Sequence, residues 1–179
     1  MLSPNPMMLV LALLLGSSAV AAQTDGSEVD RLTRFKGVFV YNFIDYVKWP
    51  EPDGVGPFVI GVLGEHEVTA TLQQIAQKRK AGDRTIVVRS FPPDRDSLPA
   101  CDILFLSASV DERLAELWGL LEGKQILTVS DTAGFAQKGV AVNFVVKAGK
   151  LKFEINTRAL AHADLDMSSQ LLKLAMLVE

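Results

Sequence analysis

Apolar runs of strand length alternate with helical patterns along most of the chain. Mostly apolar runs cover residues 58–63, 85–89, 102–106 and 125–130. Runs of this kind are typical of strands that are buried on both faces. Apolar residues at helical spacing lie between them, at residues 68–80 and 109–121. The alternation predicts a mainly parallel sheet with helices on both faces.

The two ends of this pattern differ from its middle. A helix is expected from about Ser27 to Lys48, because the following segment, residues 49–54 (WPEPDG), cannot continue a helix. Near the other end, residues 139–146 and 151–156 flank the turn KAGK, which predicts an antiparallel hairpin at one edge of the sheet. Two helices are expected to follow, at about residues 157–163 and 167–178. The predicted fold is α/β: one three-layer domain with a mainly parallel sheet and an antiparallel edge hairpin.

The first 22 residues have the pattern of an export signal. Residues 7–20 form an uncharged apolar run that is too short for a membrane span, and small residues follow it at 19–22. The alternative is a buried N-terminal helix, but residues 1–22 have no polar face. We therefore expect a signal peptide at 1–22, a flexible leader at 23–28 and one domain at 29–179. This organisation predicts a periplasmic protein whose mature chain does not insert into a membrane.

Charge and composition exclude several classes of function. The formal net charge of −3 provides no basic surface for nucleic acid. The chain has two histidines and one cysteine, and neither histidine has a metal-ligand partner at a suitable spacing, so no metal or cofactor is expected. Cys101 cannot form a disulfide within the chain, and its place beside an apolar strand predicts a buried, unreactive thiol.

Motifs for catalysis are absent from the sequence. It contains neither the phosphate-binding glycine motifs nor the G-x-S-x-G motif of hydrolases. A hydrolase could be imagined from Ser107 or Ser109 with His66 and Asp131. However, Ser109 and Glu112 also form a helix capping box, and Asp131 is a common type of turn residue. We therefore expect that the protein is not an enzyme.

Polar residues follow three of the predicted parallel strands and could form one rim. Open α/β sheets bind ligands at the carboxyl ends of their strands, where loops and helix N-termini meet. A small polar or anionic ligand would suit such a rim, although ordinary turns require the same residue types. The candidate ligand-binding residues are Glu65, His66, Ser107, Ser109 and Asp131.

The first predicted helix is unusually rich in aromatic residues. The chain has nine Phe, two Tyr and two Trp, and six of these lie between Phe35 and Trp49. One apolar stripe is enough for a helix that covers a sheet, so the surplus indicates contact with a second protein, or else a deeply buried core helix. Tyr41 and Tyr46 are the first choices for outward positions. The candidate partner-binding residues, which include part of the last predicted helix, are Phe39, Tyr41, Phe43, Tyr46, Trp49, Leu172 and Met176.

The same segments resemble the YfiR family of periplasmic regulators. Residues 36–50 (KGVFVYNFIDYVKWP) are similar to the family's opening helix and its Trp-Pro stop, and residues 58–64 (FVIGVLG) are similar to its first strand. The resemblance continues in order through the remaining blocks, which are residues 101–107, 127–131, 134–135, 142–144, 151–156 and 168–172. It covers nearly all of the chain after residue 31.

The resemblance implies a function that the residues alone do not. It implies an inhibitor that binds the periplasmic sensor domain of an inner-membrane diguanylate cyclase, restrains cyclic di-GMP signalling and biofilm formation, and forms a homodimer. Family members often have more cysteines than this chain, in which Cys101 matches a family cysteine but has no mate. A disulfide switch is therefore not expected. The alternative is a periplasmic small-ligand binding or sensor protein that acts on another partner.

Overall fold

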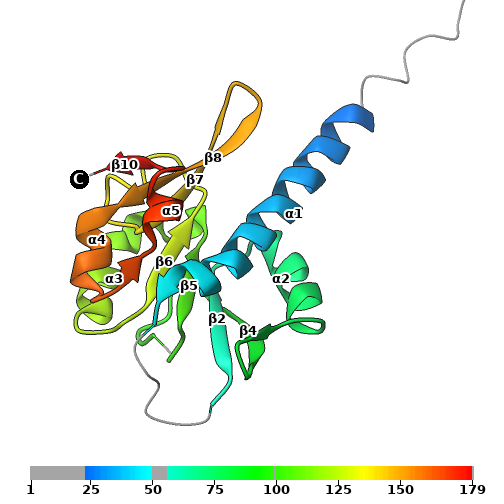
Figure 1. Cartoon of the computed structure of the whole chain (residues 1–179). Helices are drawn as coiled ribbons and strands as arrows, with labels where there is room; N and C mark the ends of the chain where they lie inside the picture. Colours follow the sequence, from blue (N-terminus) through cyan, green and yellow to red (C-terminus); the bar gives the residue numbers. More distant parts are fainter. Residues whose placement is uncertain (1–22, 50–55, 99, 179) are drawn as a thin grey trace, which may run out of the picture.

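The computed structural model describes residues 23–49, 56–98 and 100–178 (Figure 1). The predicted signal peptide and the stop at residues 50–54 lie outside the described residues. An eight-stranded sheet has the order β10-β8-β7-β6-β5-β2-β4-β3. Its strands are β2 (Phe58–Leu63), β3 (Lys80–Ala81), β4 (Arg84–Phe91), β5 (Ile103–Leu106), β6 (Leu127–Ser130), β7 (Val142–Lys147), β8 (Lys150–Asn156) and β10 (Met176–Val178).

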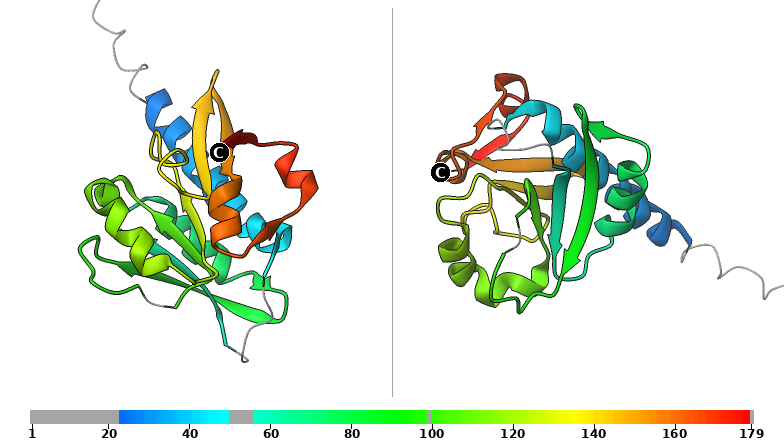
Figure 2. Two further views of the ribbon diagram at one scale, coloured as in Figure 1. Left: turned by 90° about the vertical axis from the view of Figure 1, so that its left-hand side faces the viewer. Right: turned by 90° about the horizontal axis from the view of Figure 1, so that it is seen from below.

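Five helices and one 3₁₀ helix surround this sheet. They are α1 (Gln23–Tyr46), α2 (Val68–Ala76), the 3₁₀ helix η1 (Ala108–Arg113), α3 (Leu114–Leu121), α4 (Thr157–His162) and α5 (Ser169–Leu172). Two short strands, β1 (Val47–Lys48) and β9 (Asp166–Met167), pair antiparallel with each other, separately from the main sheet. Figure 2 shows the helices divided between the two faces of the sheet.

Side-chain alternation along the buried strands creates one core on each face. In β5, Ile103 and Phe105 belong to a core with residues of α1, α2 and α4, whereas Leu104 and Leu106 belong to a core with η1 and α3. All four side chains are fully buried. An apolar residue is therefore needed at every position, which explains the unbroken apolar runs in the sequence. The predicted three-layer α/β domain with a mainly parallel sheet is confirmed.

The order of the parallel strands reverses next to β2. The chain leaves β2, forms α2 on one face and returns as β4, then crosses to β5 on the other side of β2 and forms α3 on the opposite face. Helices that leave in opposite directions open a crevice at the carboxyl ends of two neighbouring strands. Here that point lies between the ends of β2 and β5.

The predicted hairpin is confirmed, but it is not the edge of the sheet. Strands β7 and β8 pair antiparallel from Val142↔Ile155 to Lys147↔Lys150, and Ala148 and Gly149 adopt positive φ angles as a type I′ turn requires. Strand β10 adds to β8 in parallel, so β10 forms the edge beyond the hairpin. At the other end, β3 pairs antiparallel with β4.

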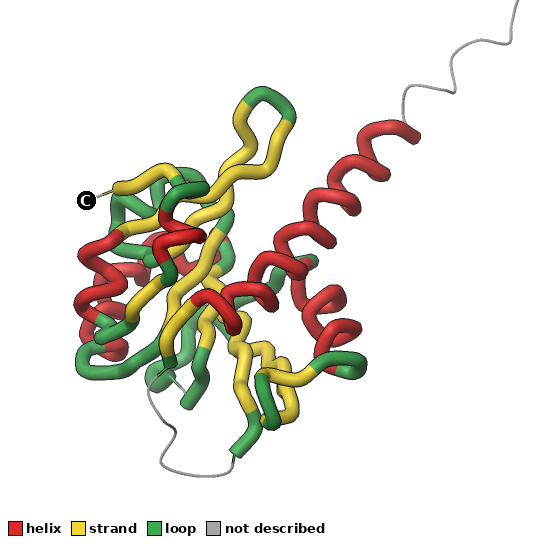
Figure 3. The backbone as a smooth tube through the Cα atoms, in the orientation of Figure 1, coloured by secondary structure: helices red, strands yellow, loops and turns green. Residues whose placement is uncertain are grey.

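The predicted helix at residues 167–178 is wrong. Only Ser169–Leu172 is helical, and strands β9 and β10 flank it (Figure 3). The Ser168 hydroxyl accepts from the Leu171 amide at 3.4 Å and starts this single turn. The apolar residues of the tail fit a helix as well as a strand, and the free edge of β8 decides in favour of a strand.

Two helix starts also differ from the prediction. Helix α1 begins at Gln23 rather than Ser27, so the residues expected to form a leader are its first turns. The expected capping box at Ser109 is wrong, because residues 108–113 form a 3₁₀ helix that follows Ser107. The Ser109 hydroxyl instead makes a hydrogen bond with the Ser107 hydroxyl at 2.7 Å.

Candidate functional site

The rim predicted at the carboxyl ends of the parallel strands is assembled at the strand-order reversal. Gly64 follows β2 with φ +81°, a conformation that side chains rarely adopt. A Cβ atom at Gly64 would lie 2.0 Å from the Ser107 Oγ and 2.2 Å from the Ser109 Oγ. Only glycine therefore allows the loop after β2 to pack against the loop after β5.

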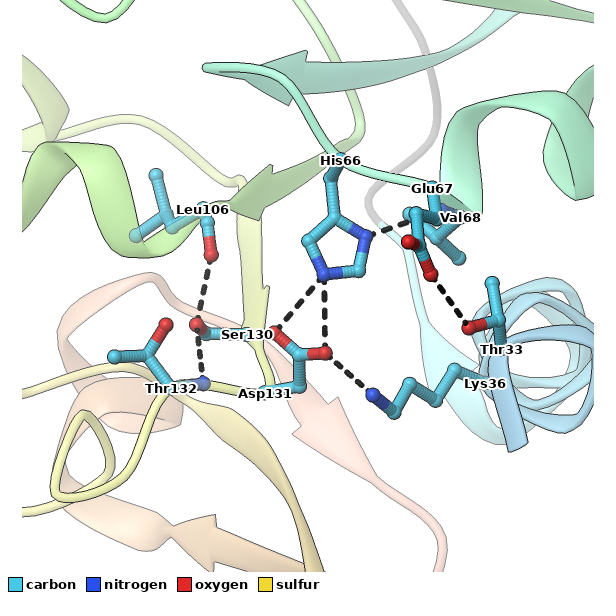
Figure 4. A network of polar contacts seen from close by, with 9 residues as sticks. All are labelled: Thr33, Lys36, His66, Glu67, Val68, Leu106, Ser130, Asp131 and Thr132. Atoms are coloured by element: carbon cyan, nitrogen blue, oxygen red, sulfur yellow. Dashed lines mark hydrogen bonds and ion pairs between the residues drawn. The ribbon is translucent and has the colours of Figure 1, made fainter. Parts of the chain in front are cut away.

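A charged cluster fills the neighbouring part of this edge, and we call Lys36, His66 and Asp131 the Asp131 network (Figure 4). Lys36 extends from helix α1, and its Nζ donates to Asp131 Oδ2 at 2.5 Å. The His66 Nε2 lies 3.0 Å and 3.1 Å from the two carboxylate oxygens. The three side chains are only 14–17% exposed, so the network joins three elements in a largely buried place.

The electrostatics of the network favour the ionised carboxylate. Burial alone would raise the pKa of Asp131, but the hydrogen bonds from His66 and Lys36, together with the positive charge of Lys36, outweigh burial and lower the pKa from 3.8 to about 2. The Val68 amide donates to His66 Nδ1 at 3.0 Å. An acceptor nitrogen carries no proton, so the hydrogen-bond pattern assigns the proton to Nε2, which donates to Asp131.

The orientation of His66 separates it from both serines. Each ring nitrogen already has a partner, and Ser107 and Ser109 are hydrogen-bonded to each other. A nucleophilic serine needs an imidazole nitrogen free to accept its proton. The described residues therefore do not assemble the Ser-His-Asp hydrolase that the sequence had allowed one to imagine.

Helix α1 is tied to this edge of the sheet at several places. The Thr33 hydroxyl donates to Glu67 Oε2 at 3.4 Å, one turn before Lys36 reaches Asp131. Beside Lys36, Gly37 packs so closely on α2 that a Cβ atom would lie 2.5 Å from the Thr71 Cγ2. The absence of a side chain at Gly37 sets the distance between the two helices, and the polar contacts set the position of α1 along the edge.

A pocket of about 510 Å³ opens beside His66. Its lining residues come from the loop after β2, the start of α2 and the end of β4, and they are Gly64, Glu65, His66, Thr69, Ser90, Phe91, Pro92 and Pro93. A volume of this size is typical of small-molecule sites. Two of the five predicted ligand-binding residues, Glu65 and His66, line it. The other three, Ser107, Ser109 and Asp131, make the internal contacts described above.

The predicted partner-binding aromatics divide between core and surface. Phe43 is fully buried and packs against Phe144 and Phe153, so it does not form part of an exposed surface, contrary to expectation. Phe39 is half-buried against the same two rings. Trp49 is half-buried as well: its indole donates to the Ile44 carbonyl at 2.8 Å, and its ring packs edge-on against Phe58.

The tyrosines and the tail residues are more accessible. The Tyr41 hydroxyl donates to the Lys80 carbonyl at 3.4 Å while its ring is half-buried, and Tyr46 is 37% exposed. Leu172 and Met176 are both half-buried. Tyr46 is therefore the most accessible aromatic of the predicted set.

Sequence reasoning left three exposed apolar residues of α1 out of the partner-binding set. Val29, Phe35 and Val38 of α1 are 49%, 48% and 44% exposed. The N-terminal half of this helix projects away from the sheet (Figure 1). Phe35 lies one turn before Phe39, so the spacing suggested a continuous stripe. The spacing of Phe35, Phe39 and Phe43 along one side of the helix was visible in the sequence. The residue at which the helix extends beyond the sheet was not.

The sequence of this chain was compared with models of known protein families. The chain matches the family model described as YfiR/HmsC-like over residues 33–176, from the middle of α1 to the start of β10. The chain belongs to the YfiR/HmsC-like family. None of the curated proteins matches it. Membership of this family indicates a regulator rather than an enzyme, and it suggests a periplasmic protein that acts on a diguanylate cyclase.

Two further observations describe this YfiR/HmsC-like chain. Across residues 23–49, 56–98 and 100–178, no helix combines the length and the apolar character needed to cross a membrane. Within the same ranges, His, Cys, Asp and Glu do not gather in groups of three that could hold a metal ion.

Proposed function

We propose that the protein inhibits a membrane-bound diguanylate cyclase by binding its periplasmic sensor domain, and so restrains cyclic di-GMP signalling and biofilm formation. Family membership supports a regulator of such a cyclase. The observation that carries the proposal is the pair of exposed apolar residues Phe35 and Val38 near the middle of α1. Phe35 and Val38 are three residues apart and therefore share one side of the helix, and we call them the α1 stripe. The predicted signal peptide would deliver the protein to the periplasm.

The α1 stripe has the composition of an interface anchor. Large apolar side chains that gather on one exposed element usually mark a contact with another protein, and an aromatic ring often contributes most of the binding energy. Phe35 is the one aromatic of the stripe and is about half exposed. Tyr46, lower on the same helix, extends the accessible apolar surface towards β1.

Rigidity of α1 supports the same role. The helix packs on α2 through Gly37 and is fixed by the contact of Lys36 with Asp131. A surface that is already ordered loses little conformational entropy when a partner binds. The stripe would therefore meet the cyclase in its binding geometry, and the Asp131 network would serve the complex without touching the partner.

The decisive experiment compares two variants, one with a negative charge in the α1 stripe and one with the same charge at an unrelated exposed position. Phe35→Glu should weaken binding to the purified periplasmic domain of the cyclase about tenfold to a hundredfold, as the loss of a hot spot of about 1–3 kcal/mol would. Cells with this variant should contain more cyclic di-GMP and form heavier biofilm. The control is Ala115→Glu, an exposed position in α3 on the opposite face of the sheet.

The readouts separate docking from folding. Both variants should melt within a few degrees of the wild type, because both positions are exposed. Unchanged affinity and unchanged cyclic di-GMP in Phe35→Glu would remove the stripe from the interface. We also propose that the protein forms a homodimer; sedimentation of Phe35→Glu reports whether the stripe lies in that contact instead.

A second candidate function is supported by the pocket beside His66. A small ligand in this pocket would contact the histidine that holds Asp131 and, through it, Lys36 of α1. A ligand that binds two states unequally shifts the balance between them, so it could change how α1 is presented. Filling the pocket with Ser90→Trp separates the two functions. If Ser90→Trp still inhibits the cyclase but the inhibition no longer responds to a ligand, the pocket serves ligand sensing alone.

A further inference from the structure

The β7–β8 hairpin carries three lysines on one face. Lys147 and Lys150 are directly opposite each other in the antiparallel register, so their side chains lie on the same side of the ladder. Lys152 follows Lys150 by two residues and therefore shares that side. All three are exposed. We call these three residues the lysine face.

The lysine face is not neutralised within the described chain. Like charges directly opposite each other on paired strands are destabilising. No carboxylate in the described ranges lies within ion-pair distance of these ammonium groups, and the Lys147 Nζ instead contacts the Met176 sulfur at 3.1 Å. Glu154, the next residue on this side of β8, faces the Asn143 side-chain amide at 3.5 Å.

Three uncompensated positive charges are unexpected in a chain whose net charge is −3. Nothing in the packing of the hairpin requires them, because the core contacts come from Phe144 and Phe153 on the other side of the strands. A cluster that weakens the hairpin and has no carboxylate partner among the described residues is best explained by an anion that is not part of them.

The position of the hairpin indicates what kind of anion this is. Its tip extends from the body of the protein at the same end as the N-terminal half of α1 (Figures 1 and 2). Val146, on the opposite side from the lysines, is 54% exposed, close to the tip. Lysines next to exposed apolar residues on a projecting element are typical of segments that lie on anionic lipid surfaces.

We propose that the tip of the β7–β8 hairpin binds an anionic membrane surface through Lys147, Lys150 and Lys152, with Val146 entering the headgroup region. The choice of a membrane rests on the proposed function, which places the protein beside a membrane-bound partner. The hairpin and the N-terminal half of α1, next to the α1 stripe, extend from the same end of the molecule (Figures 1 and 2). Contact with lipid would therefore hold the stripe close to the membrane, where the cyclase begins.

The test is vesicle binding with a matched pair of variants. The mature protein should bind vesicles that contain phosphatidylglycerol and not vesicles of phosphatidylcholine alone, and added salt should weaken the binding. The triple variant Lys147→Gln, Lys150→Gln, Lys152→Gln should lose about a hundredfold in partitioning, at about fivefold for each lysine near the surface. The control triple variant is Lys78→Gln, Arg79→Gln, Lys80→Gln, which removes an equal charge from another exposed basic run.

Folding supplies an independent readout. Because the hairpin lysines repel one another, the hairpin variant should melt at the wild-type temperature or slightly above it. A lower melting temperature would assign the lysines a structural role and overturn the proposal. Equal vesicle binding by the two triple variants, or no preference of the wild type for anionic vesicles, would overturn it as well.

A protein partner is the remaining outcome. If the hairpin variant binds the soluble periplasmic domain of the cyclase more weakly while the wild type ignores vesicles, the lysine face contacts an acidic protein surface and the membrane proposal is wrong. The vesicle assay contains no cyclase. Its result is therefore independent of whether the protein inhibits one.

Discussion

Replacing Asp131 with asparagine tests the central electrostatic claim. Asp131→Asn keeps the size of the side chain but removes its charge, so the Lys36 ammonium and the His66 N–H lose their acceptor in a place that is only 14–17% exposed. Each pKa unit corresponds to about 1.4 kcal/mol, so lowering the pKa of Asp131 from 3.8 to about 2 is equivalent to about 2 kcal/mol. We expect the variant to lose about 2–3 kcal/mol at pH 7, because Lys36 is also left without its partner.

The pH dependence has a definite sign. The pKa of Asp131 is lower in the folded protein than in the unfolded chain, so its contribution is complete above about pH 5 and is lost as the pH falls from 4 towards 2. The contribution of the Asp131 carboxylate to the difference between wild type and Asp131→Asn should therefore be complete at both pH 7 and pH 5. By pH 3 it should fall to about half, because the wild-type carboxylate has begun to lose its advantage.

Urea unfolding at these three pH values measures the effect, and a melting temperature lowered by about 5–10 °C at pH 7 accompanies it. Asp111→Asn is the matched control, because Asp111 pairs with Lys138 at a site where both side chains are about half exposed. Exposed pairs contribute at most about 1 kcal/mol. Equal losses in the two variants, or a difference that does not shrink at pH 3, would refute the reasoning.

The remaining predictions concern a thiol and a glycine. Burial, followed by the neighbouring charge of Asp102, raises the pKa of Cys101 to about 12, so Ellman's reagent at pH 8 should leave the native thiol unmodified for hours and label it promptly in urea; rapid labelling of the native protein would contradict this. Gly64→Ala should lower the free energy of unfolding by about 2–4 kcal/mol, since its Cβ would meet the Ser107 hydroxyl at a positive φ. A loss of less than about 0.5 kcal/mol in urea unfolding would show that the two loops can separate.

Strands and turns were predicted correctly where burial or backbone geometry restricts the residue types within a short segment. Residues 58–63 and 103–106 are apolar at every position because each strand has a core on both faces, and buried strands were predicted at 58–63 and 102–106. The hairpin was predicted for a similar reason, since its turn needs two residues with positive φ and the sequence supplies Ala148 and Gly149. In these places the physical requirement and the sequence signal involve the same few residues.

The tail shows why other parts could not be predicted. Met176–Val178 is a strand only because β8 has a free edge, and the formation of that edge depends on pairing among β6, β7 and β8. Nothing within residues 167–178 records this pairing, while their apolar spacing fits a helix. Strand order is inaccessible for the same reason, because each pairing depends on residues far apart in the sequence.

The candidate site lies between these two cases. His66 and Asp131 were placed on one rim because they follow strands whose carboxyl ends meet at one edge of the sheet. Lys36 was not placed there, because nothing in α1 indicates that the helix crosses that edge, yet Lys36 is the residue that connects the network to α1. One side of α1 enters the core at Phe43, and the Lys36 contact fixes the rest of the helix on the rim. The N-terminal half of α1 projects away from the sheet (Figure 1), and Val29 and Phe35 are about half exposed. An inhibitor that uses this half must hold it in place from its base, so loss of the Asp131 network should weaken inhibition more than loss of an exposed ion pair does.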